Sequence, residues 1–360
     1  MSTELTPVEA HLARCLALVG PLPPLFGRGY TLPYYGVESG YFLNFNRGKR
    51  SLALNLRHDA APALLRRLAA ESDVIVENFS PGTLAKWGLA WEQLQEINPR
   101  AVLVSMAGVG SAGPWRSAVT FADTLAAMSG LTHETGRDGR PPQGLTFGLG
   151  DMVAANAATL ATLEHLVRGE GGHVDLSQLE AMAAHLGTAL IETVVSDDGT
   201  DADTTGRTVG PLTLRTAGED RWLTVGATPA PAFNSAVAAI SGNVGDDPEA
   251  ALAKAAGETD ADLLAAHLQQ HGVAAYAVRD GRDLVTVDRQ LGARGFYPVQ
   301  KHPLAGEVQV EGIVAHLGDT PGRLTSPAPL LGQHTDVLLE EILGLDPDQI
   351  HHLHEQGVLE

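Results

Sequence analysis

The sequence predicts an α/β fold, with a doubly wound, mostly parallel sheet in a large domain and a smaller α/β domain after it. Short apolar runs alternate with segments of helical periodicity between residues 51 and 106, the pattern of strands joined by crossover helices. A polar, acidic stretch at 196–206 marks a boundary, and a shorter α/β alternation follows it. We therefore expect a large domain over residues 1–205, completed by 316–360, and a small domain over 207–315.

The periodicity places the elements in order along the chain. Strands in the large domain are expected at 51–56, 73–77, 101–106 and 173–176. Helices are expected at 7–20, 60–71, 84–97 with a break near Gly88, 120–130, 152–168, and 177–195 with Ser177 as its cap. The remaining expectations are strands at 221–225, 274–278 and 308–317, helices within 230–271, and two short helices within 334–354.

The composition limits the class of protein. The chain has 360 residues, 44% of them apolar, which is enough to bury the cores of two domains. Its net charge of -19 argues against nucleic-acid and anionic-membrane partners, because both require basic patches. The single cysteine, Cys15, is typical of a reducing compartment. No apolar run approaches the roughly 20 residues of a membrane span, and the N-terminus lacks the basic region of a signal peptide. We expect a cytoplasmic protein.

Ligands of a parallel sheet bind outside the carboxyl ends of its strands, which directs attention to the loops at 78–82 and 107–115. The second loop contains Gly108-Val-Gly110-Ser-Ala-Gly113, which matches a dinucleotide fingerprint. However, Pro114 and Trp115 stand where a helix should open, and no acidic residue follows at the spacing that binds a ribose. We interpret this loop as a Gly-rich turn and not as a nicotinamide site.

Gly148-Leu149-Gly150-Asp151 leads into an apolar helical run that continues to Arg168. Asp151 is thereby placed at the positive end of a helix dipole, on a turn where glycine lets a ligand approach closely. The plain alternative is structural, because aspartate is a favoured N-cap. From these residues alone, both interpretations stay open.

Two other chemistries lack support in the sequence. His351, His352 and His354 have no accompanying carboxylate or cysteine constellation, so we expect no metal site. The Gly-x-Ser-x-Gly elbow of a serine hydrolase is absent.

Several segments are informative when they are read together. They are Asn46–Leu56, Asp73–Gly82, Ile97–Arg100, Gly108–Pro114, Ala127–Gly130, Gly150–Asp151 and Ser326–Thr335. These segments follow one another in the order found in a known family. Through them the chain resembles the class III coenzyme A transferases, a family that includes formyl-CoA and carnitine CoA-transferases and acyl-CoA racemases. The resemblance covers roughly residues 41–358. It implies a Rossmann-like large domain and an interlocked dimer.

The resemblance implies that Asp151 is a nucleophile. A carboxylate that attacks an activated thioester forms a mixed anhydride and releases CoA thiolate. The thiolate returns to give an aspartyl-CoA thioester, and a carboxylic acid acceptor then takes over the CoA. Backbone N–H groups of a Gly-rich loop would stabilise the oxyanions. The expected partners are an acyl-CoA and a carboxylic acid, with CoA as part of the substrate and no tightly bound cofactor.

The resemblance also implies how CoA is held. The positions that correspond to CoA contacts in the family are Leu54, Arg57, Asn78, Phe79, Lys86 and Trp87. Asn78 and Phe79 match residues at the adenine end, and Lys86 stands where the family often has an arginine near the phosphates. An acidic chain needs local cations for an anionic ligand, and Arg57 and Lys86 supply them.

Racemases of this family use a histidine opposite the aspartate, and Phe121 occupies that position here, so the transferase is favoured. Ala122 stands where many relatives have a carboxylate, and residues 1–40 lack the family's first strand and active-site loop. Three interpretations follow: an active transferase, a subunit completed by a full-length relative, and a non-catalytic CoA-binding partner. We therefore expect a homodimer or a heteromer, and the sequence does not identify the acyl group.

Overall fold

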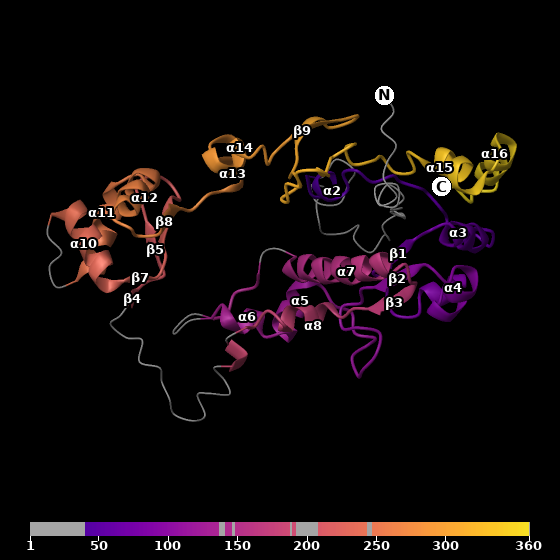
Figure 1. Ribbon diagram of the computed structural model, residues 1–360, viewed down its shortest axis with the longest axis horizontal. Helices are drawn as coiled ribbons and strands as arrows, with labels where there is room; N and C mark the ends of the chain where they lie inside the picture. Colours follow the sequence, from indigo (N-terminus) through magenta and orange to yellow (C-terminus); the bar gives the residue numbers. More distant parts are fainter. Residues whose placement is uncertain are drawn as a thin grey trace. The chain divides into compact units, whose positions relative to one another are not determined.

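A computed structural model describes residues 40–136, 141–145, 148–187, 189–191, 208–242 and 247–359 (Figure 1). The chain divides into two compact units, which we call unit 1 (1–197 with 299–360) and unit 2 (198–298). The expected helix at 7–20, the expected acidic boundary at 196–206 and the atypical segment 1–39 lie outside the described residues. The division into domains at 205, 207 and 315 remains a prediction.

Unit 1 is built on a parallel sheet. Its three described strands are β1 (Val74–Glu77), β2 (Val102–Ser105) and β3 (Gly172–Asp175), in the order β1-β2-β3. Val102 is level with Val74 on one side and with Gly172 on the other. These strands confirm three of the four that the sequence predicts for the large domain. β1 and β2 are short apolar runs bounded by turn residues, whereas β3 has one large apolar residue, Val174.

Helices connect the strands of unit 1 and complete it. In chain order they are α2 (Gly40–Phe45), α3 (Ala61–Ala70), the 3-10 helix η2 (Leu84–Trp87), α4 (Trp91–Ile97), α5 (Ala122–Met128), α6 (Leu131–Glu134), α7 (Leu149–Arg168), α8 (Gln178–Ala183), α15 (Thr335–Leu343) and α16 (Pro347–Glu355). The predicted break near Gly88 is confirmed: Gly88 ends η2 with a φ of 74°, a left-handed conformation that glycine adopts without strain.

Alternate side chains of the sheet face two different cores. Val102 and Val104 pack with Ala154 and Ala158 of α7, which lies along the sheet in Figure 1. Leu103, between the two valines, belongs to the opposite core, which α3, α4, α15 and α16 cover. The strand period of two thus explains why helices cover both faces of the sheet.

The strand predicted at 51–56 is wrong, since this segment joins no described sheet. The N–H of Ser51 donates to Nδ1 of His334 at 3.1 Å, and the N–H of Ala53 donates to Oγ1 of Thr335 at 2.9 Å. The N–H of Asn55 donates to the carbonyl of Val358 at 2.8 Å. The C-terminal residues therefore take the place of a neighbouring strand.

The helix predicted from Ser177 to Val195 is also too long. Ser177 caps α8 as expected, with its Oγ accepting from the N–H of Glu180 at 3.2 Å. The helix nevertheless ends at Ala183, and Gly187 adopts a φ of 56°, which an α-helix cannot contain. The last predicted residues, 192–195, lie outside the described part of the chain.

Unit 2 contains an antiparallel sheet with its own core. The strands are β4 (Thr208–Val209), β5 (Leu212–Arg215), β6 (Trp222–Val225), β7 (Thr228–Pro229) and β8 (Ala275–Ala277), with β5-β6-β8 as one sheet. The helices are α10 (Ala230–Ser241), α11 (Pro248–Glu258), α12 (Ala261–Gln270), α13 (Gly281–Thr286) and α14 (Arg289–Ala293). Leu223, Phe233 and Leu264 are fully buried in the core between them. The predicted strands at 221–225 and 274–278 are confirmed.

The strand predicted at 308–317 is mostly wrong. The structure has a hairpin of β9 (Val299–His302) and β10 (Gly306–Gln309), which belongs to unit 1. Gln309 ends β10, and the residues after it up to Leu317 form no strand.

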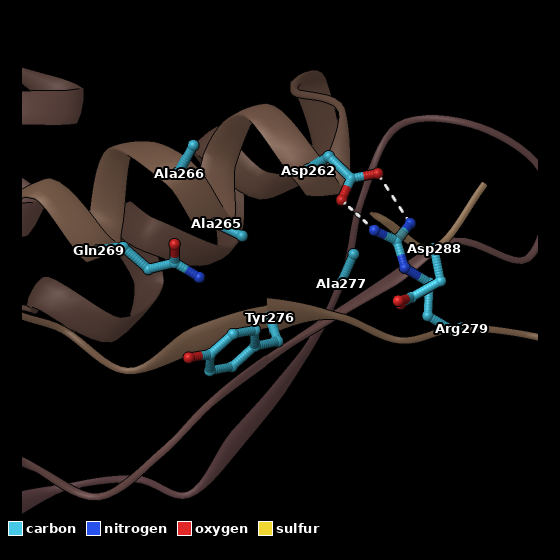
Figure 2. A pocket seen from close by; sticks show the side chains of 8 residues that line it. All are labelled: Asp262, Ala265, Ala266, Gln269, Tyr276, Ala277, Arg279 and Asp288. Atoms are coloured by element: carbon cyan, nitrogen blue, oxygen red, sulfur yellow. Dashed lines mark hydrogen bonds and ion pairs between the residues drawn. The ribbon is translucent and has the colours of Figure 1, made fainter. Parts of the chain in front are cut away.

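An open pocket of about 360 Å³ lies between α12 and β8 in unit 2 (Figure 2). Arg279 closes one end through two hydrogen bonds to the carboxylate of Asp262, at 2.8 and 2.5 Å. Gln269 lies toward the other end, where its amide donates to the carbonyl of Ala275 at 2.7 Å. None of the residues singled out in the sequence lines this pocket.

Candidate active site

Asp151 lies in the first turn of α7 but does not cap it. The helix begins at Leu149 and not at Met152, so the N-cap position falls on Gly148. Among the described residues, no side chain caps this turn. The structural interpretation of Asp151 as an N-cap is therefore wrong, and its carboxyl group is available for other contacts.

The two glycines beside Asp151 provide space in two directions. A Cβ on Gly148 would lie 3.0 Å from Oδ2 of Asp151, so any larger residue would crowd the carboxylate. A Cβ on Gly150 would lie 2.7 Å from Sδ of Met182, a distance that real Cβ atoms essentially never show. Gly150 is thus needed for the close contact of α7 with α8, and Gly148 for access to the carboxylate.

The topology places Asp151 at the carboxyl edge of the sheet. The C-terminal end of α7 connects through Gly169–Gly171 to the start of β3, so α7 runs opposite to the strands. Its N-terminus consequently lies at the edge where β1, β2 and β3 end. This is the edge at which open α/β sheets bind ligands.

Gln178 of α8 is a buried neighbour of the Asp151 carboxyl group, and the sequence interpretation missed it. Only 4% of Gln178 is exposed. Its Nε2 donates to the carbonyl of Met106, just after β2, at 3.4 Å. Because a carbonyl only accepts, this bond assigns the NH₂ group of Gln178 to the side of Met106. The only signal in the sequence was a polar residue at the start of an otherwise apolar helix.

Partial burial raises the pKa of the Asp151 carboxyl above its ordinary value, because the surrounding protein replaces part of its hydration. The hydrogen bond from Gln178 opposes this shift, since it favours the charged form. The side chain still keeps contact with solvent. The result is a carboxylate that is accessible and more basic than usual, which are both properties of a nucleophile.

The Gly-rich loop after β2 is fixed by its neighbours. Both oxygens of Asp175 accept from Ser111, one from its N–H at 3.2 Å and the other from its hydroxyl. The N–H of Gly110 donates to the carbonyl of Ala107 at 3.2 Å, in a turn where Gly110 adopts a φ of 83°. The glycines of this fingerprint therefore serve a turn, and the N–H groups of Gly110 and Ser111 are already paired.

The expected adenine-end residues lie directly after β1. The rings of Phe79 and Trp87 meet edge to face, with centroids 5.5 Å apart and planes at 83°. Phe79 is 46% exposed, and Lys86 is exposed on η2 next to Trp87. Asn78 precedes Phe79 at the end of the strand. The structure thus brings Phe79, Lys86 and Trp87 together as an aromatic surface with a cation beside it.

Leu54 and Arg57 have different surroundings. Leu54 is 3% exposed and belongs to the core against which Trp87 packs. Arg57 is exposed, and its N–H donates to Oδ1 of Asn55 at 3.2 Å. Sequence reasoning missed Arg66, whose Nη1 donates to the carbonyl of Trp87 at 3.0 Å. Its position on α3, facing η2, could not be read from the helical period alone.

Phe121 is the N-cap residue of α5 and is 60% exposed. Ala122 follows as the first residue of that helix. Neither side chain can transfer a proton, so the racemase chemistry that needs a histidine at this position is disfavoured.

The comparison with known families decides the assignment. The profile of CoA-transferase family III matches residues 27–335. The chain belongs to CoA-transferase family III. Its fold agrees with this: it is similar to the solved structure of a CaiB/BaiF family protein from Brucella suis, with a TM-score of 0.75, 25% identity and 88% of each chain covered.

Curated relatives of this family III chain are named as CoA-transferases. It is 29% identical to a succinyl-CoA–D-citramalate CoA-transferase of Chloroflexus aurantiacus, over 87% of this chain and 83% of that protein. It is 28% identical to the beta subunit of a succinyl-CoA–L-malate CoA-transferase from the same organism, over 88% of this chain and 84% of that subunit.

Within the described ranges, no group of three or more His, Cys, Asp or Glu side chains is arranged to hold a metal ion. No helix of that part of the chain combines the length and apolar character needed to cross a bilayer.

Proposed function

We propose that this chain moves CoA between an acyl-CoA thioester and a carboxylic acid, with Asp151 as the nucleophile. The observation that carries the proposal is the Asp151 carboxyl group itself. It caps no helix, it has room beside Gly148, and its pKa is raised by partial burial. The reaction type named for the relatives supports the same conclusion.

The reaction has four displacement steps that balance without a proton. A carboxylate oxygen of Asp151 attacks the donor acyl carbon, and the C–S bond breaks to release CoA thiolate. The thiolate attacks the Asp151 acyl carbon of this anhydride, which releases the donor acid and leaves an aspartyl-CoA thioester. The acceptor carboxylate attacks that thioester and expels the thiolate. The thiolate finally attacks the acceptor acyl carbon, which forms the new acyl-CoA and frees Asp151.

We assign CoA binding to the surface around Phe79 and Trp87. In this assignment adenine contacts Asn78 and Phe79, because an exposed aromatic ring offers a face for stacking. Lys86 and Arg57 neutralise phosphate charge, which an acidic chain must provide locally. Leu54 and Trp87 support this surface from the core.

The names of the relatives suggest the first substrates to test. Both are named for succinyl-CoA as donor, with citramalate or malate as acceptor. We propose succinyl-CoA and a dicarboxylic acid as the first pair, in a cytoplasmic setting.

The test is to incubate the chain with succinyl-CoA and hydroxylamine and to locate the adduct by mass spectrometry. Hydroxylamine converts an activated carboxyl group to a hydroxamate, which we expect at Asp151 and not in Asp151→Asn. Asp348→Asn is the matched control, because Asp348 is an exposed carboxylate in the first turn of α16. A hydroxamate elsewhere, or one that persists in Asp151→Asn, would contradict the assignment.

A partner-dependent subunit is the second candidate. Relatives of this chain are subunits of a heteromeric transferase, and the sequence predicts no counterpart of the family's first strand within residues 1–40. In that case Asp151 is labelled only after a full-length relative is added. CoA binding without labelling under either condition would indicate the non-catalytic partner. For each candidate we propose a doubly wound, Rossmann-like large domain in an interlocked dimer.

A further inference from the structure

We propose that the junction between α2 and the hairpin of β9 and β10 binds a small oxyanion that also carries an O–H group, the chemistry that hydrogen phosphate and 2-hydroxy carboxylates share. The groups that hold it are Arg47, Lys49 and Gln300, which all belong to unit 1. This binding site is additional to the reaction at Asp151 and does not depend on it.

The turn after α2 is fixed against β9 by one shared acceptor. The carbonyl of Ser326 accepts from the N–H of Gly48 at 2.9 Å and from Nε2 of Gln300 at 3.0 Å. Gly48 separates Arg47 from Lys49 and adopts a φ of 73°, which turns the chain sharply between them. The amide of Gln300 is therefore a neighbour of the turn that carries both cations.

Only one side of the Arg47 guanidinium has a protein partner. Nη1 donates to the carbonyl of Asn44 and, at 2.7 Å, to its Oδ1, which also accepts from the N–H of Glu311 at 3.0 Å. Among the described residues, Nε of Arg47 is buried and has no hydrogen-bond partner. A cation at the C-terminal end of α2 explains the bonds of Nη1, but it leaves the buried Nε–H unexplained. A guanidinium edge of this kind binds a carboxylate or a phosphate through two parallel hydrogen bonds.

The two positive charges at the junction have little compensation. Nζ of Lys49 donates to Oδ1 of Asn46 at 3.2 Å, which is a neutral partner. Within the described part of the chain, neither Arg47 nor Lys49 forms an ion pair. Partial burial lowers the pKa of both groups; Glu311 opposes this for Arg47, whereas repulsion from Arg47 lowers the pKa of Lys49 further. A bound anion would offset both the burial and the repulsion.

Gln300 restricts which anion fits. Its Nε2 donates to a carbonyl, so the orientation of the amide is fixed. Its Oε1 is buried and has no partner among the residues that the structure describes. This oxygen accepts from a hydroxyl group and repels an oxygen that carries only negative charge. A ligand that satisfies all three side chains therefore offers charged oxygens to Arg47 and Lys49 and an O–H to Gln300.

The test is isothermal titration calorimetry of the full chain at constant ionic strength, with inorganic phosphate, L-malate, succinate and chloride as separate probes. We expect phosphate or malate to bind at one site, and succinate and chloride to bind at least about tenfold more weakly because they lack an O–H group. The tighter of phosphate and malate identifies the source of the oxyanion. No binding of either, or equal affinity for all four probes, would overturn the proposal.

Three variants locate the bound anion. Arg47→Gln should weaken its binding by about 10–100-fold, because charged hydrogen bonds are lost. Arg100→Gln is the matched control, since Arg100 is an exposed arginine of unit 1, and it should keep the affinity. Lys86→Ala should also keep it, which separates this site from the surface assigned to CoA. Loss of binding in Lys86→Ala with retention in Arg47→Gln would overturn the proposal.

A second measurement uses the unmodified side chains. The NMR signal of the Arg47 Nε–H, assigned by its absence in Arg47→Lys, should shift when the preferred anion is added and not when chloride is added. An unshifted signal would overturn the proposal even if Arg47→Gln does not fold. Gln300→Met removes the acceptor, so the preference for malate over succinate should fall to about threefold or less. An unchanged preference would contradict the O–H requirement.

Discussion

Gly150→Ala should weaken the contact between α7 and α8 although alanine is the better helix former. The new Cβ would lie 2.7 Å from Sδ of Met182, where carbon contacts in a protein core are about 3.5–4.0 Å apart. Met182 is fully buried, so its side chain has no solvent into which it can turn. The overlap is relieved by a change in the Met182 rotamer within the core or by movement of α8.

The expected magnitude follows from two opposing effects. Overpacking of a core costs roughly 1–3 kcal/mol. Replacing a helical glycine by alanine gains up to about 1 kcal/mol. We expect a net loss of about 0–2 kcal/mol in the free energy of unfolding. Activity should fall further, by about 10²-fold, because Asp151 follows Gly150 directly and a shift of about 1 Å there disturbs the reacting geometry.

A double-mutant cycle isolates the overlap from the helix propensity. Met182→Ala alone should cost about 2–5 kcal/mol, since it empties a buried site. In that background Gly150→Ala no longer meets a sulfur atom, so it should stabilise the chain by up to about 1 kcal/mol. The coupling energy between the two positions should therefore be about 1–3 kcal/mol in favour of the double variant.

The assay is urea unfolding followed by tryptophan fluorescence. Trp222 lies in unit 2, so a Trp222→Phe background confines the signal to the tryptophans of unit 1. Additive effects of Gly150→Ala and Met182→Ala would refute the reasoning, because they would mean that the two side chains do not share the same space.

Two further predictions concern the site. Because the pKa of Asp151 is raised, its carboxylate binds a proton more tightly in the folded chain than in the unfolded chain. At a pH above the pKa of the folded chain, the ionised group therefore lowers the free energy of unfolding. Asp151→Asn should thus melt at a higher temperature than the unmodified chain near neutral pH. The difference in melting temperature should vanish as the pH falls below the pKa of Asp151 in the unfolded chain. A difference that does not depend on pH would contradict this prediction. Lys86→Ala should raise the KM for acyl-CoA roughly tenfold with little change in kcat, as expected for one charged hydrogen bond. Lys254→Ala, an exposed lysine of unit 2, is its control, and an unchanged KM in Lys86→Ala would remove Lys86 from the site.

The sequence predicts most of unit 1 because burial leaves a local pattern. The strands β1 and β2 are apolar runs between turn residues, and a window of a few residues is enough to find them. The segment at 51–56 shows the limit of that method. Its apolar pattern reports burial correctly, yet its partners are His334, Thr335 and Val358, which no local window contains.

The candidate site was predicted unevenly for similar reasons. Asp151 is a candidate from the sequence because two glycines before an acidic residue are unusual and match a motif of the family. The sequence predicts that α7 begins at Met152 and not at Leu149, because glycine disfavours helices. In the structure Gly150 is helical, and its lack of a Cβ leaves room for Sδ of Met182. The burial of Gln178 is not predicted, because it is paired with the carbonyl of Met106, which the fold brings to it from a distant part of the chain.

The large core of unit 1 has a consequence for synthesis on the ribosome. Leu338, Leu339 and Ile350 from the C-terminal helices share one core with Leu103 of β2. Unit 2 is continuous in sequence and has a core of its own, so it can fold as soon as it emerges. The sheet at whose carboxyl edge Asp151 lies keeps one face uncovered until the last helices have been translated. The nascent chain therefore exposes an apolar surface for most of its synthesis, and it is during this interval that a chaperone would bind.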